Sequence, residues 1–253
     1  MEKEAEKFEI ILGVKFESLT FDEALSRLRR FLDTEEHNVC FTPNPEMLMS
    51  AWKDAEFRDI LNKADLILPD GIGIIMASFF YRRKITRRVG GCDIVQELFK
   101  TAEKPLRVYF LGAAPGVCAL AKENVEKKYR NISVVGFNDG YFDYEKEKLI
   151  IAEIQSLKPD MLLVGIGFPK QEKWIARHKN ELPVRLSIGV GGTLDVLAGA
   201  VKRAPKIFRS VGAEWLYRLI SQPSRYKRMS RLPVFLIMAA WEGVRSRFKK
   251  GER

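Results

Sequence analysis

The chain has 253 residues, of which 46% are hydrophobic and 30% charged; these ordinary proportions exclude an extensively disordered protein. The length suits one α/β domain, alone or with a small appendage. Residues 201–253 hold 14 Lys and Arg against 3 acidic residues, whereas residues 1–200 hold 29 against 30. We therefore expect the last fifth of the chain to meet an anionic partner such as phospholipid, nucleic acid or a diphosphate.

The first ten residues are charged and lack the apolar core of a signal peptide. No apolar run reaches the roughly 20 residues that span a bilayer. The three cysteines, Cys40, Cys92 and Cys118, are widely spaced and form no CxxC pair, which favours reduced thiols. We expect a cytoplasmic protein that does not cross a membrane.

Short apolar segments, each followed by Gly, Pro or Asn, recur along the first 200 residues. Segments that are apolar throughout are typical of a parallel sheet covered on both faces. The strands expected from this pattern are 39–42, 66–68, 108–111, 133–136, 161–165 and 186–190.

Helical patterns alternate with these strands, at 22–32, 46–63, 73–82, 93–102, 116–129, 144–157 and 170–180. The alternation predicts an α/β fold, a doubly wound and mostly parallel Rossmann-like sheet, over residues 1–200. After residue 200 the strand signals stop. We expect residues 201–253 to form a basic helical appendage, broken at Pro205, Pro223 and Pro233.

Three Gly-rich loops follow expected strands, and ligands bind beyond the carboxyl ends of such strands. The first contains Gly112 and Gly116, and the others are 165–172 and 189–192. Such loops present backbone N–H groups to a phosphate, although each is also explained as a tight turn without a ligand. The GxGxxG spacing is absent, so together the loops indicate a nucleotide-sized ligand rather than a dinucleotide.

Asp70 follows the second expected strand, within LPDGIG. A carboxylate at that position can act as a general base or as a helix N-cap, and position alone favours the cap. Asp93 in GGCD and Asp195 in GGTLD have the same two interpretations.

Other polar side chains lie near strand ends. Thr42 and Asn44 in TPNPE offer rigid hydrogen-bonding groups for sugar hydroxyls and acetamides, or simply turn chemistry. Arg88, next to Arg87, can neutralise a diphosphate or belong to a solvated charged face. Gln171 and Glu172 open a helix after a proline, where we expect hydrogen bonds to the ligand.

A metal site is not expected. The two histidines are far apart in the sequence, and no DxD triplet occurs. An enzyme without a metal must stabilise a leaving diphosphate with helix dipoles and cationic side chains. Arg218, Arg225 and Arg228 suit bidentate phosphate binding.

The segment 232–241 is apolar, contains Trp241 and is flanked by cations. This pattern fits binding to an anionic lipid surface. The alternative is an amphipathic helix that docks on the core or on a second subunit.

Nine motifs in order resemble the WecG/TagA/CpsF family of bacterial glycosyltransferases, also called glycosyltransferase family 26. They span most of residues 8–230. The motifs are TPNPE at 42–46, LPDGIG at 68–73, RRVGGCD at 87–93, FLGAAPG at 110–116, GFNDGYF at 136–142, GIGFPKQEKWI at 165–175, GVGGTLDVLAG at 189–199, KRAP at 202–205 and GAEWLYRLISQPSRYKR at 212–228.

The resemblance implies an inverting, metal-independent enzyme without a cofactor. It would move N-acetylmannosamine from a UDP donor to undecaprenyl-diphosphate-linked GlcNAc, in teichoic acid or surface polysaccharide assembly. UDP-glucose or the uronic acid of UDP-N-acetylmannosamine are alternative donors.

The resemblance also assigns roles to residues at motif positions. Asp70 becomes the general base, and Thr42 and Asn44 line the sugar pocket, which Arg88 and Gln171 also reach. The three tail arginines fall on an appendage that closes over the active site and contacts the inner face of the cell membrane. Gln222 stands where the family often has Glu.

Two functions from other classes fit the sequence less well. A nucleic-acid-binding protein would use the basic tail, but an apolar stretch interrupts it and no known binding motif occurs. An NAD-dependent oxidoreductase would need a GxGxxG turn followed by an acid, which is absent. The expected partners are therefore a UDP-sugar, a polyprenyl-diphosphate acceptor and an anionic membrane, without nucleic acid; a homo-oligomer is a further hypothesis.

Overall fold

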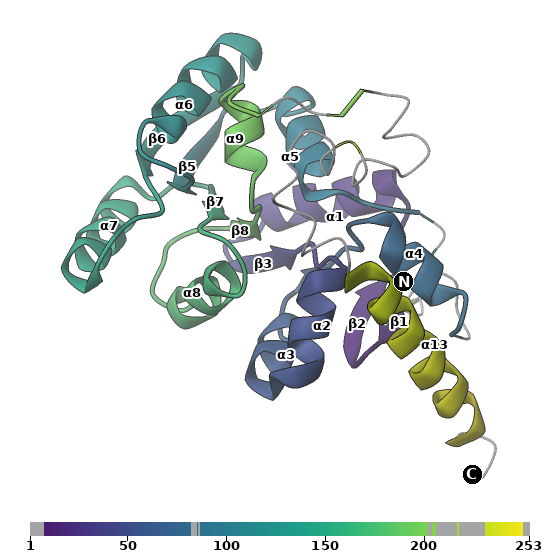
Figure 1. Cartoon of the computed structure of the whole chain (residues 1–253). Coiled ribbons are helices and arrows are strands. Elements are labelled where there is room, and N and C mark those ends of the chain that lie inside the picture. The colour runs from purple at the N-terminus through teal and green to yellow at the C-terminus, as the bar shows by residue number, and fades with distance from the viewer. Residues whose placement is uncertain are drawn as a thin grey trace.

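A computed structural model describes residues 8–81, 85, 87–201, 204–205, 217 and 231–249. Its centre is a six-stranded parallel sheet with the order β4-β3-β8-β7-β5-β6 (Figure 1). All six strands expected from the sequence are confirmed. Their bounds are β3 (Asn38–Phe41), β4 (Leu66–Ile67), β5 (Leu106–Gly112), β6 (Ile132–Asn138), β7 (Met161–Gly165) and β8 (Leu186–Gly189).

Helices cover both faces of this sheet, as the apolar strands require. Alternate strand residues point into two separate apolar clusters: Tyr109 and Leu111 into one, and Val108 and Phe110 into the other. Helices α1 (Phe21–Leu32), α5 (Gly91–Lys100), α6 (Val117–Lys128) and α9 (Thr193–Leu197) pack on one face. Helices α2 (Pro45–Lys53), α3 (Ala55–Asn62), α7 (Tyr144–Leu157) and α8 (Lys170–His178) pack on the other. The doubly wound α/β, Rossmann-like fold is therefore confirmed.

Two predicted helices differ from those observed. The expected helix 46–63 is two helices, because Asp54 ends α2 and its side chain accepts a hydrogen bond from the Phe57 N–H to begin α3. The expected helix 73–82 is the shorter α4 (Ile72–Ser78).

A hairpin of β1 (Phe8–Ile11) and β2 (Val14–Glu17) precedes the sheet and was not predicted. Its two-residue turn, Leu12 and Gly13, has positive φ at both positions (49° and 81°). That geometry suits a tight hairpin, but Leu is an unusual residue there, so this turn has no strong sequence signal.

The C-terminal helix α13 (Arg231–Lys249) begins with Pro233 in its first turn, so the predicted break at Pro233 is wrong. Proline is tolerated there because first-turn N–H groups have no partner within the helix. Phe235 and Ala239 are buried in the same cluster as α2 and α4. A Cβ on Gly243 would lie 2.6 Å from the Phe80 carbonyl oxygen, so the helix packs closely on the segment after α4.

Of the other predicted tail breaks, Pro205 lies outside any described helix and Pro223 lies outside the described residues. Among the helices that the structure describes, none combines the length and apolar character needed to cross a bilayer.

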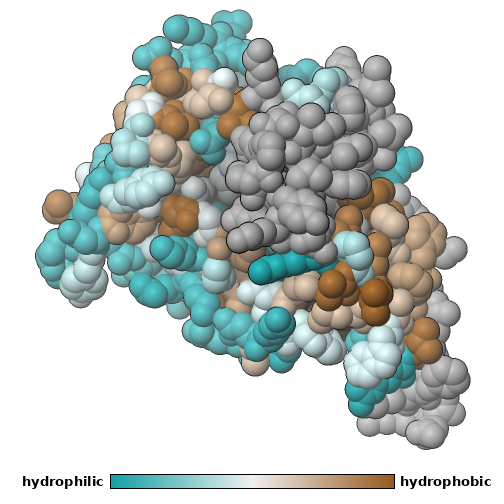
Figure 2. Space-filling model, viewed as in Figure 1, coloured by the Kyte–Doolittle hydropathy of each residue, from teal (hydrophilic) through white to brown (hydrophobic). Residues whose placement is uncertain are grey.

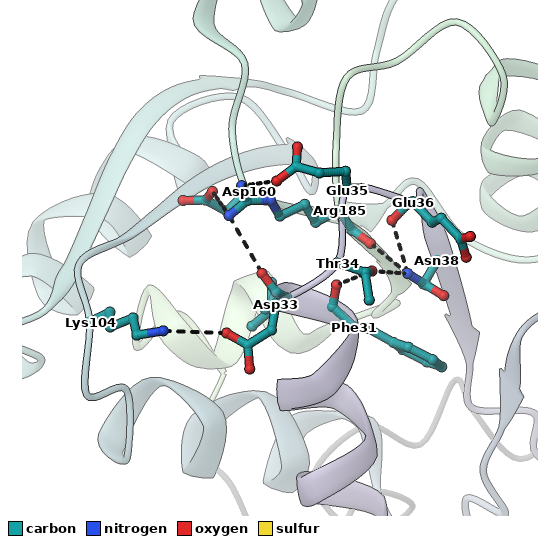
Figure 3. A network of polar contacts seen from close by, with 10 residues as sticks. Phe31, Asp33, Thr34, Glu35, Glu36, Asn38, Lys104, Asp160 and Arg185 are labelled. Atoms are coloured by element: carbon teal, nitrogen blue, oxygen red, sulfur yellow. Dashed lines mark hydrogen bonds and ion pairs between the residues drawn. The ribbon is translucent and has the colours of Figure 1, made fainter.

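Polar contacts fix the amino-terminal edge of the sheet (Figure 3). Arg185, just before β8, pairs with Glu35 (2.6 Å) and with Asp160 before β7 (3.3 Å). Asn38, at the start of β3, donates through Nδ2 to Thr34 Oγ1 at 3.1 Å. Three neighbouring strands are thus held together at the edge opposite to the one where ligands bind in such sheets.

His37 is half-buried between β3, β8 and the end of α8. Its Nδ1 lies 2.7 Å from the Lys179 carbonyl oxygen and its Nε2 lies 2.7 Å from Ser187 Oγ. A neutral ring satisfies both contacts, since Nδ1–H donates to the carbonyl and Nε2 accepts from the hydroxyl. Burial is the largest influence and lowers the pKa of His37 below its ordinary value of 6.5.

This depressed pKa predicts a loss of stability in acid. Below the ordinary pKa, the unfolded chain binds a proton at His37 that the folded protein does not bind. The free energy of unfolding therefore decreases as the pH is lowered, until the pH is below the pKa of the folded protein. When the pH is lowered from about 7 to about 5, the free energy of unfolding of wild type, measured by urea denaturation, should therefore decrease more than that of His37→Gln. Identical pH slopes for the two proteins would contradict the assignment.

Candidate active site

A cavity of about 460 Å³ opens at the carboxyl ends of four neighbouring strands, β4, β3, β8 and β7. The chain leaves β3 toward β4 on one side, while β8 lies on the other side. Such a switch in direction leaves a crevice in which ligands bind. The volume lies within the range of about 300–1,000 Å³ that is typical of small-molecule sites.

Thr42 and Asn44 line this cavity, directly after β3. Asn44 Oδ1 caps α2 by accepting hydrogen bonds from the N–H groups of Glu46 (3.0 Å) and Met47 (3.1 Å). A Cβ on Gly91 would lie 2.8 Å from Thr42 Oγ1, so α5 begins against this threonine. Asn44 therefore has a structural role and a place in the cavity at the same time.

Asp70 is not the N-cap residue of α4, contrary to the interpretation that its position alone favoured. The N-cap of α4 is Gly71 (φ 98°), which has no side chain with which to cap the helix. Instead, Arg88 Nε donates to Asp70 Oδ1 at 3.1 Å, and Arg88 Nη2 lies 3.6 Å from Asp93 Oδ2. Asp70 and Arg88 line the cavity. Asp93, in the first turn of α5, is not part of the lining and contacts the site through Arg88.

Gln171 reaches the cavity from the first turn of α8. Its Oε1 accepts from the Gly191 N–H at 3.2 Å, and its Nε2 donates to Glu172 Oε1 at 2.7 Å. Glu172 is 1% exposed and lies behind Gln171, outside the lining. Burial, the dominant cause, raises the pKa of Glu172 to about 7. Asp195, on α9, does line the cavity.

Trp174 belongs to the core and not to the cavity. It is buried, and its ring lies 4.7 Å from the ring of His178, centroid to centroid. Packing against this histidine explains an aromatic side chain at the start of α8.

The family described as Glycosyl transferase WecG/TagA/CpsF matches residues 9–249. The chain belongs to the WecG/TagA/CpsF glycosyltransferase family. It is 36% identical over 233 residues, 91% of either chain, to the N-acetylglucosaminyldiphosphoundecaprenol N-acetyl-beta-D-mannosaminyltransferases of Staphylococcus aureus strains MRSA252 and MW2. The enzyme is thus a glycosyltransferase, and the alternative of an NAD-dependent oxidoreductase is set aside.

Not every residue expected in the site of this glycosyltransferase lies in the cavity. Gly112 and Gly116 are outside its lining, because β5 is fifth in the sheet order and its loop lies beyond β7. Gly112 has a packing reason instead: at φ 145°, a Cβ there would lie 2.5 Å from the Gly165 carbonyl group. Arg218, Arg225 and Arg228 lie outside the described residues.

The glycosyltransferase cavity also contains residues that the sequence did not single out. They include Glu46, Met47, Met49, Phe168, Thr193 and, from α13, Arg231 and Leu232. Leu232 Cδ1 would lie 2.7 Å from a Cβ on Gly73, so the start of α13 packs directly on the start of α4. The C-terminal helix therefore completes one wall of the site. Within the described parts of the chain, no three His, Cys, Asp or Glu residues are grouped so as to hold a metal ion.

Proposed function

We propose that this enzyme transfers N-acetylmannosamine from a UDP donor to GlcNAc linked to undecaprenyl diphosphate, with inversion and without a metal. The observation that carries the proposal is the Asp70–Arg88 pair at the wall of a nucleotide-sized cavity. The activity for which the Staphylococcus aureus relatives are named supports the transferred sugar and the acceptor.

In this mechanism the acceptor hydroxyl attacks the anomeric carbon while Asp70 takes its proton. The new oxygen–carbon bond forms as the bond from the anomeric carbon to the donor diphosphate breaks, and the electron pair leaves with UDP. A single displacement of this kind inverts the anomeric centre. Arg88 holds Asp70 Oδ1 and so fixes the orientation of the carboxylate.

The leaving diphosphate needs positive charge and N–H donors. The loop after β8 supplies the exposed backbone of Gly192, and α13 supplies Arg231. We expect Arg218, Arg225 and Arg228 to add to this charge.

Titration calorimetry with UDP in the presence of EDTA tests the donor half of the proposal. Binding of UDP, without binding of NAD, is the expected result. Binding that requires an added divalent metal would contradict metal independence, and no binding of UDP under either condition would contradict the donor class.

The outer face of α13 supports a second part of the proposal, contact with an anionic membrane surface. Val234, Ile237, Trp241 and Val244 recur every three or four residues and are exposed, whereas Phe235 and Ala239 are buried. Figure 2 shows hydrophobic residues gathered on this side of the molecule, over α4 and α13. Arg245 lies 5.1 Å from the Trp241 ring, as cation and aromatic groups do at membrane interfaces.

Ile237→Glu should weaken binding to vesicles that contain anionic lipid by more than about tenfold, because it removes apolar burial and adds repulsion. Leu149→Glu on α7 is the matched control, since Leu149 is 71% exposed and Ile237 is 70% exposed. Flotation measures both. If both variants float like wild type, the membrane face is wrong. If wild type self-associates through Ile237 without floating, α13 covers a second subunit instead.

A further inference from the structure

Glu172 is a buried acid that the proposed transfer chemistry does not use. Its Oε1 accepts from Gln171 Nε2 at 2.7 Å, while its Oε2 is buried and has no hydrogen-bond partner among the residues that the structure describes. Both side chains lie against the last residue of β8. A Cβ on Gly189 would lie 3.1 Å from Gln171 Nε2 and 3.4 Å from Glu172 Oε1, so glycine leaves room for the pair.

The two ends of the Gln171 amide have different partners. Nε2 donates to Glu172, and Oε1 accepts from the Gly191 N–H at 3.2 Å. If the amide were turned over, its oxygen would face a carboxylate oxygen and its NH₂ group would face an N–H group. An ionised carboxylate only accepts hydrogen bonds. Above its raised pKa of about 7, Glu172 therefore selects the orientation in which Gln171 can hold Gly191.

Gly191 lies in the loop between β8 and α9, and residues 189–193 of this loop all line the cavity. The loop is rich in glycine, and Gly191 has φ 50°. Glycine has the largest conformational freedom to lose on ordering. A side chain that holds the loop from behind therefore reduces the cost of ordering it when a ligand binds.

We propose that Glu172 is a positioning residue that acts through Gln171 to hold the β8–α9 loop in the shape that receives the donor's uridine diphosphate. The ligand named here rests on the proposed function. The role assigned to Glu172 differs from the direct ligand contact expected from the sequence, because its carboxylate lies behind Gln171.

A double-mutant cycle measures this coupling, with the dissociation constant of UDP from calorimetry as the readout. Glu172→Ala should weaken UDP about tenfold, the size expected for one hydrogen bond to a charged group. Glu172→Ala added to Gln171→Ala should weaken it no further. Glu172→Gln keeps a carbonyl oxygen that accepts from Gln171, so UDP affinity should return to within about threefold of wild type.

Glu153→Ala is the control for loss of a carboxylate elsewhere. Glu153 accepts from Tyr109 Oη (2.5 Å) and Asn138 Nδ2 (3.0 Å) and does not line the cavity. This variant should lower the denaturation midpoint without changing UDP affinity.

Amide hydrogen exchange of residues 189–193 without ligand is the second readout, and it does not depend on the donor. Exchange should be faster in Gln171→Ala and Glu172→Ala and unchanged in Glu172→Gln and Glu153→Ala. Additive losses of UDP affinity in the double variant, or wild-type loop exchange in Glu172→Ala, would overturn the inference. Wild type that fails to bind UDP would overturn the donor, while the exchange result would still decide the role of Glu172.

Discussion

Replacement of Asp70 by Asn is expected to lower turnover by roughly 10²–10⁴-fold and to leave the affinity for UDP within about threefold of wild type. Asn has the same shape and keeps a carbonyl oxygen that can accept from Arg88 Nε, which lies 3.1 Å from Asp70 Oδ1. It cannot take the proton of the acceptor hydroxyl. The measurements are acceptor-dependent release of UDP and calorimetric binding of UDP.

Asp93→Asn is the matched control for this variant. Asp93 pairs with the same arginine, through Nη2 at 3.6 Å, but it does not line the cavity. Its loss should reduce turnover by about tenfold or less, through Arg88 alone. Equal losses in the two variants would assign the effect to the position of Arg88 and remove Asp70 from the role of base.

Gly112→Ala should have the largest effect on stability, a loss of about 3 kcal/mol or more in the free energy of unfolding. At φ 145°, its Cβ would lie 2.5 Å from the Gly165 carbonyl carbon and oxygen. Because both atoms are backbone, β5 and β7 must separate to make room. Urea denaturation measures the loss.

Gly116→Ala is the control within the same turn. Gly116 also has positive φ (83°), but no described residue would lie within 4 Å of a Cβ there, so a cost of about 1 kcal/mol is expected from the backbone alone. If Gly112→Ala remained as stable as wild type but lost UDP binding, the ligand contact predicted from the sequence would be right and the packing role wrong.

The sheet could be predicted from the sequence because its strands are apolar on both faces. The hairpin at 8–17 could not, since its two-residue turn contains Leu12, a residue that is unusual at positive φ. The break at Asp54 was also hidden, because apolar residues continue at helical spacing through 46–63. Pro233 was expected to break a helix but lies in the first turn of α13. Proline disrupts the interior of a helix but is tolerated in its first turn.

The site could be predicted in part, for a reason that lies in the topology. Residues just after β3, β4, β7 and β8 were expected near a ligand, and Thr42, Asn44, Asp70 and Gln171 do line the cavity. No single sequence segment shows which strands are neighbours in the sheet, so the loop after β5 was also expected at the cavity. Arg231 and Leu232 come from a helix far along the chain, whose docking depends on tertiary packing.

The burial of Glu172 also could not be predicted from the sequence. At the start of an amphipathic helix, neighbouring polar residues look alike in the sequence. In the structure Gln171 lines the cavity, whereas Glu172 does not and is 1% exposed.

The central claim is tested most directly by incubating the enzyme in EDTA with a panel of UDP-sugars and an undecaprenyl-diphosphate-GlcNAc analogue, and analysing the lipid product by mass spectrometry and NMR. The proposal predicts that UDP-N-acetylmannosamine alone extends the lipid by one N-acetylhexosamine, joined with inverted anomeric configuration. Extension only with another UDP-sugar, retention of configuration, or a requirement for a divalent metal would contradict it.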